Sequence, residues 1–75
     1  MKLPLLSATE IIKALEKADF RVVRQKGSHI SLYKRNDTKT YLVVVPNTSE
    51  VKRGTLLNIL KQAGMSREDF FSLLK

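Results

Sequence analysis

Hydrophobic positions along the chain change their spacing, and these changes divide it into helical and extended segments. Residues 7–18 carry apolar side chains on one face at helical spacing, and Ser7 and Glu10 are placed as a capping box at the start. We therefore expect a first helix over residues 8–18. Three shorter runs follow, which are rich in β-branched residues or alternate with a period of two. They predict strands at residues 20–25, 29–34 and 40–46.

The C-terminal part of the chain returns to helical spacing. Apolar residues fall on one face of residues 55–64, Gly64 is placed to end this helix, and Ser66 is placed to begin a short final one. This order predicts an α+β fold, a three-stranded antiparallel sheet with two helices on one face and a short C-terminal helix. The α-β-β-β-α order is that of the double-stranded RNA-binding domain. We expect residues 1–75 to form a single domain.

The period of two also indicates where the single histidine lies. Ile30 and Leu32 of the second predicted strand point to one side of the sheet. His29, Ser31 and Tyr33 point to the other side. If Ile30 and Leu32 face the core, His29 lies on the open face of the sheet. An ordinary surface histidine at the start of a strand fits the same pattern.

The chain is strongly basic, and its charge is concentrated in the middle. The formal net charge is +7 at pH 7, and residues 17–53 hold nine of the 14 Lys and Arg residues but three of the seven Asp and Glu residues. This distribution favours a surface that binds a polyanion, most simply nucleic acid. A basic face that meets an acidic protein, or a solvated surface without a partner, would carry the same charge.

Other features of the composition disfavour several classes of protein. The chain has no cysteine, which excludes disulfides and thiolate metal clusters and fits the reducing cytoplasm. Its apolar runs are too short to span a membrane, and Pro4 breaks the N-terminal one, which disfavours a secretory signal. The acidic residues are scattered without a metal-binding pattern. We therefore expect a cytoplasmic protein that contacts no membrane and needs no metal or cofactor.

Three segments of the chain resemble the HicA toxin family, also described as YcfA-like small proteins. They are the amphipathic N-terminal helix, the segment "RQKGSHISLY" and the segment "VKRGTLLNILKQAGMSREDF", which together cover nearly the whole chain. The resemblance implies a stress-response toxin of a type II toxin–antitoxin pair, an endoribonuclease (mRNA interferase) that cleaves messenger RNA. It also implies inhibition by a HicB-type antitoxin, with the chain either a monomer or part of a heteromeric complex.

The chain departs from the family pattern at three positions. Family members often carry a second histidine directly after the first and another after the proline of the third strand, where this chain has Ile30 and Asn47. A single imidazole predicts a modest nuclease. A glycine that ends the first helix is also common in the family. Here that residue is Asp19, which adopts a left-handed conformation less readily than glycine.

His29 is the candidate catalytic residue. RNA is cleaved when its 2′-hydroxyl attacks the adjacent phosphate, so a protein needs to remove that proton and to protonate the leaving 5′-oxygen. An imidazole transfers protons near neutral pH, and such help typically contributes a factor of about 10² to 10⁴ in rate. Four cations are candidates for binding RNA and for stabilising the charged phosphorane: Lys26, Lys34, Lys52 and Arg53.

Three further residues are candidates for RNA binding. Tyr33, on the same strand face as His29, is placed to stack on a base or to share in proton transfer. Gly27 allows a positive φ or a close approach of phosphate, and Ser28 is placed to orient His29 or to contact phosphate, although a plain tight turn explains both residues equally well. Backbone amides at the start of the second predicted helix are also candidates for phosphate contact. In the alternative interpretation, this segment is an ordinary solvated helix start with Thr55 as its cap.

Two other functions fit the sequence. One is a non-catalytic RNA-binding module of the same fold, and the other is a basic domain that binds an acidic protein. Cleavage that is lost in His29→Ala would exclude the first, and RNA affinity that falls steeply with salt would exclude the second. An antitoxin that covers the basic face and His29 would compete with RNA.

Overall fold

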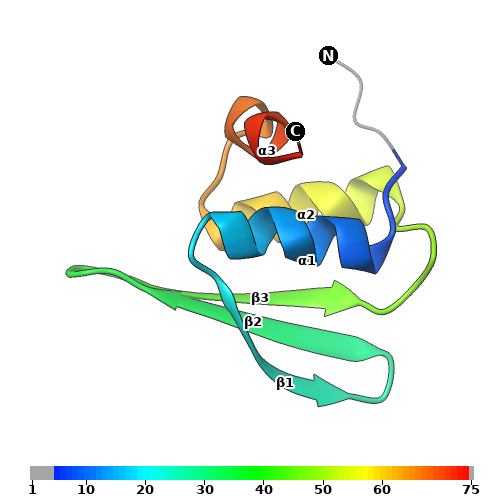
Figure 1. Cartoon of the computed structure of the whole chain (residues 1–75), viewed down its shortest axis with the longest axis horizontal. Helices are drawn as coiled ribbons and strands as arrows, with labels where there is room; N and C mark the ends of the chain where they lie inside the picture. The colour runs from blue at the N-terminus through cyan, green and yellow to red at the C-terminus, as the bar shows by residue number, and fades with distance from the viewer. Residues whose placement is uncertain (1–4, 75) are drawn as a thin grey trace.

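The computed structural model describes residues 5–74, and Figure 1 shows the arrangement of the elements. Pro4, on which the expectation about a secretory signal depends, lies outside the described residues. The elements are α1 (Ala8–Lys17), β1 (Arg21–Lys26), β2 (His29–Arg35), β3 (Thr40–Pro46), α2 (Arg53–Ala63) and α3 (Arg67–Leu73). This order confirms the predicted α+β fold. Within residues 5–74, no helix is long and apolar enough to cross a membrane.

The helices cover one face of the sheet and leave the other face open. The sheet is an antiparallel meander in the order β1-β2-β3, and α1 and α2 both lie on one side of it (Figure 1). α2 contacts β3, and α1 contacts both β3 and α3, so that α3 is the element farthest from the sheet. β1 extends beyond this cover, and all of its residues are exposed.

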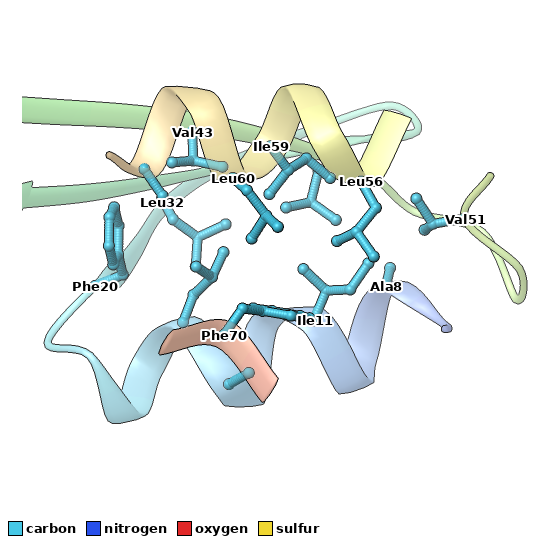
Figure 2. Packing of buried hydrophobic residues seen from close by; sticks show 14 of the residues in the cluster. Ala8, Ile11, Phe20, Leu32, Val43, Val51, Leu56, Ile59, Leu60 and Phe70 are labelled. Carbon is cyan, nitrogen blue, oxygen red and sulfur yellow. The ribbon is translucent and has the colours of Figure 1, made fainter. Parts of the chain in front are cut away.

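The core lies between the sheet and the helices. β2 and β3 bury alternate residues, which point toward the helices: Ile30, Leu32, Val43 and Val45. Figure 2 shows the helical side chains that meet them, including Ile11 of α1, Leu60 of α2 and Phe70 of α3. Burial of an apolar side chain of this size contributes about 1.5–3 kcal/mol. Among the described residues no polar or charged side chain is buried, so apolar packing stabilises this core.

Hydrogen bonds fix the start of α1 and connect it to the loop before α2. The Ser7 hydroxyl accepts from the Glu10 N–H at 3.2 Å, and the Glu10 carboxylate accepts from the Ser7 N–H at 3.0 Å, which confirms the predicted capping box. The Val51 N–H donates to the Leu6 carbonyl at 2.7 Å. The loop of residues 47–52 is therefore held against the start of α1.

The end of α1 requires a left-handed residue. The Phe20 N–H donates to the Leu15 carbonyl and the Asp19 N–H donates to the Glu16 carbonyl, both at 3.1 Å. These two bonds form a Schellman motif, in which Asp19 has a φ of 71°. Phe20 is 2% exposed and packs in the core. The first strand therefore begins one residue later than predicted, because Phe20 belongs to the helix cap.

A β-bulge in β1 changes which residues face the open side. The register shifts between Val22 and Arg24, so that Val23 is an extra residue without a partner. In a regular strand, Arg21 and Arg24 would point to opposite faces of the sheet. The extra residue cancels this difference and places both arginines on the open face.

Gly27 and Ser28 form a two-residue turn between β1 and β2. Lys26 and His29 pair on either side of the turn, and Gly27 has a φ of 58°. Ser28 does not have a positive φ, and a positive φ at the first central position alone is the pattern of a type II′ turn, whose twist fits antiparallel strands. The Asn47 N–H donates to the Ser28 carbonyl at 2.6 Å, which connects the turn to the end of β3.

α2 begins two residues earlier than predicted and ends where predicted. Its first residue is Arg53, and the N-cap Lys52 makes no side-chain hydrogen bond to the helix. Thr55 therefore lies within the first turn and is not the cap. The boundary was missed because no capping side chain marks it in the sequence. At the other end Gly64 adopts the left-handed conformation, with a φ of 65°.

We expect Asp19→Gly to stabilise the protein by roughly 0.5–1 kcal/mol. A left-handed conformation costs an ordinary residue about 1–2 kcal/mol, and the greater freedom of glycine in the unfolded chain offsets part of that gain. Urea unfolding of wild type and variant measures the difference. The control is Ala18→Gly, at a neighbouring residue with a φ of −95°, which should destabilise. Equal effects of the two substitutions would contradict the explanation.

Gly27→Ala and Gly54→Ala should change stability in opposite directions. An added methyl group would meet no atom within 4 Å at either position, so backbone conformation alone separates the two variants. Gly27 has a positive φ, and its replacement should destabilise by about 1–2 kcal/mol. Gly54 is helical, and its replacement should stabilise by up to about 1 kcal/mol. Thermal unfolding of both variants tests the prediction, and destabilisation by both would refute it.

Candidate functional site

His29 is exposed on the open face of the sheet, at the start of β2. It pairs with Lys26 of β1 and with Pro46 of β3, so these two side chains share its face. The next residue, Ile30, is 7% exposed and points into the core, as does Leu32. The predicted alternation, with Ile30 and Leu32 inside and His29 on the open face, is therefore confirmed.

A row of cations runs along β1 beside His29. Lys26 lies opposite His29 and Arg24 lies opposite Ser31, so both cations face the open side, and the bulge adds Arg21. Alternate residues of a strand are about 7 Å apart on one face. We call these three side chains, Arg21, Arg24 and Lys26, the cation row. Of the three, sequence reasoning named only Lys26 as a site residue. Regular alternation from Lys26 adds Arg24, whereas Arg21 reaches this face only because of the bulge.

The strands contribute positively charged side chains to the open face and no negatively charged ones. None of the three strands contains an acidic residue. Within residues 5–74, no three His, Cys, Asp or Glu side chains come together in a group that could hold a metal ion. The surface around His29 is therefore suited to an anionic ligand.

The turn before His29 and the start of α2 lie at the same end of the molecule. Gly27 and Ser28 are exposed, and the space beside Gly27 is open. Lys52 and Arg53 are also exposed, at the start of α2 (Figure 1). These four predicted residues therefore lie near the end of the sheet at which His29 stands.

Tyr33 is on the open face but farther along β2. It is half-buried and pairs with Arg21 and with Leu42. Its Cα lies four residues, or about 13 Å, from that of His29 along the strand. At this separation the two side chains cannot share proton transfer at one phosphate. Stacking on a base is the role that the position permits.

Lys34 is not brought together with His29. It follows Ile30 and Leu32 at alternate positions and therefore points to the side of the sheet that the helices cover. Its Nζ lies 5.5 Å from the centroid of the Phe20 ring, in a cation–π contact. Lys34 thus belongs to a different surface from the other predicted RNA-binding residues.

A groove of about 340 Å³ lies between His29 and α2. One wall consists of His29, Val44 and Pro46, and the other consists of Thr55, Asn58, Ile59 and Gln62. Oε1 of Gln62 accepts a hydrogen bond from the Val44 N–H at 3.1 Å, so α2 covers part of the edge of β3. Sequence reasoning missed the groove because it followed only the apolar face of this helix. The helical spacing of the polar residues beside that face was the available signal.

The two positions at which HicA proteins often carry further histidines differ in orientation. Ile30 points into the core, so an imidazole there would face away from His29. Asn47 is exposed and follows Pro46, the partner of His29 in β3. Both positions lie near His29, but only position 47 has its side chain exposed at that end of the sheet.

Comparison with protein families gives a match over most of the chain. The family described as HicA toxin of bacterial toxin–antitoxin matches residues 8–65 of the 75. The matched segment extends from the start of α1 beyond the end of α2 and includes His29, the cation row and the groove. A search of curated proteins found no match. On the family match, the chain belongs to the HicA family of toxins of bacterial toxin–antitoxin systems.

Proposed function

We propose that this toxin is a metal-independent endoribonuclease that cleaves messenger RNA in the cytoplasm, with His29 as the proton-transfer group. RNA binds across the open face, between the cation row and the groove beside α2. One observation carries the proposal. The chain belongs to the HicA family, and its single histidine, His29, is exposed next to Lys26, to the turn of residues 27–28 and to the groove beside α2.

The reaction needs no nucleophile from the protein. The 2′-hydroxyl oxygen of RNA bonds to the adjacent phosphorus, the bond to the 5′-oxygen breaks, and a 2′,3′-cyclic phosphate forms. His29 accepts the hydroxyl proton or donates a proton to the leaving oxygen, and solvent water carries out the other transfer. Lys26, directly opposite His29, stabilises the negative charge of the phosphorane. With one imidazole for two proton transfers, acid–base help from this residue is limited to a factor of about 10² to 10⁴.

The RNA backbone follows the cation row. Its three side chains are spaced along one strand face, as successive phosphates are along an extended RNA strand. Lys52 and Arg53 add positive charge at the end where His29 stands, and Gly27 and Ser28 leave room for a phosphate beside the turn. Tyr33 stacks on a base farther along the strand.

A HicB-type antitoxin inhibits the toxin by covering this face. The open face also carries the exposed apolar side chains of Leu42 and Val44, which are 57% and 36% exposed. Apolar side chains next to cations are typical of protein interfaces. A partner with acidic groups around an apolar centre would contact both and would compete with RNA for the same surface.

We expect His29→Ala to lower the rate of RNA cleavage by about 10² to 10⁴ while RNA affinity changes less than about threefold. The measurement uses a labelled RNA and purified protein in EDTA. Ser31→Ala, two residues along the same strand face, is the matched control and should cleave at close to the wild-type rate. A folded wild-type protein that binds the RNA without cleaving it would instead support the non-catalytic binding module.

We expect Arg21→Gln and Arg24→Gln each to reduce the slope of log affinity against log salt by about 0.7, the value for one phosphate contact on a single strand. Fluorescence anisotropy with a labelled RNA in increasing salt measures the slope. Lys13→Gln, on the exposed side of α1, removes the same charge from the opposite face and should leave the slope unchanged. Equal slopes in all three variants would contradict RNA binding on the open face.

A further inference from the structure

The groove beside His29 carries polar groups that the cleavage reaction does not use. Thr55, Asn58 and Gln62 are spaced three and four residues apart, so they project from one side of α2. Oε1 of Gln62 already accepts from the Val44 N–H, which fixes its carboxamide and leaves the NH₂ group as its donor. Asn58 is exposed at the rim and offers both a donor and an acceptor.

Apart from His29, the remaining lining of the groove is apolar. Val44 and Pro46 contribute from β3, and Ile59 contributes from α2. A volume of about 340 Å³ is at the lower end of the range of small-molecule sites, which is roughly 300–1,000 Å³. A groove with apolar walls, carboxamides at its edge and this size has room for one nucleobase.

We propose that this groove binds the unpaired base of a nucleotide next to the cleaved bond, and that Asn58 and Gln62 select the base by hydrogen bonds to its edge. The inference rests on the proposed ribonuclease function. Carboxamide side chains recognise base edges that present a donor beside an acceptor. With the base in the groove, the adjoining phosphate lies next to His29 and Lys26. The substrate is therefore single-stranded at the point of cleavage, because a base that is stacked and paired in a duplex is not free to enter the groove.

The test compares cleavage of a single-stranded RNA library, randomised over a central segment, by wild type and by Asn58→Ala. Sequencing of the fragment ends gives the preference for each base next to the cleaved bond. The wild-type protein should prefer one base by about tenfold or more, and Asn58→Ala should reduce this preference to less than about threefold. Asn58→Ala should fold, because residue 58 is an exposed helical position and alanine favours helix.

Gln25→Ala is the matched control. It removes a carboxamide from the other face of the sheet, where Gln25 pairs with Ile30, and it should keep the wild-type preference. Cleavage by wild type without a base preference, or an unchanged preference in Asn58→Ala, would overturn this inference and leave the proposed function standing. Absence of cleavage by folded wild type would overturn both. Annealing a complementary strand to a preferred RNA should protect it, and equal cleavage of the duplex would contradict single-strand recognition.

Discussion

The pairing of Leu32 with Val43 beneath the helices determines where every other side chain of β2 and β3 points. Both residues are fully buried, and they lie opposite one another in neighbouring strands. Because a strand alternates its sides, their burial places His29 on the open face. A slip of one residue would bury the imidazole and expose Leu32, so the same apolar contact stabilises the fold and presents the candidate catalytic group.

Two neighbouring faces of α2 make different contacts, one with the core and one with the candidate site. Leu56 and Leu60 pack in the core (Figure 2), whereas Asn58 and Gln62 line the groove beside His29. Ile59, between these two sides, contributes to both. The hydrogen bond from the Val44 N–H to Gln62 joins this helix to the strand edge. The width of the groove is therefore set by how the core packs. Mutations in that core would therefore change the shape of the groove as well as stability.

The sequence was sufficient to predict features with a local signal and insufficient for those that depend on pairing. A capping box and a helix-ending glycine marked two helix ends, and alternation placed His29. No residue type marks Val23 as a bulge, because the extra residue is defined only by its missing partner in β2. The groove likewise depends on where α2 lies against β3. The position of Lys34 on the covered side follows from the alternation that also placed His29.

The most direct test of His29 as a proton-transfer group is the chemical nature of the fragment ends that purified wild-type protein produces from RNA in EDTA. Attack by the 2′-hydroxyl leaves a 2′,3′-cyclic phosphate on one fragment and a 5′-hydroxyl on the other, and the structure leads us to expect these ends. Fragments that carry a 3′-hydroxyl and a 5′-phosphate would mean that water attacks the phosphorus directly. That result would contradict the mechanism proposed for the open face.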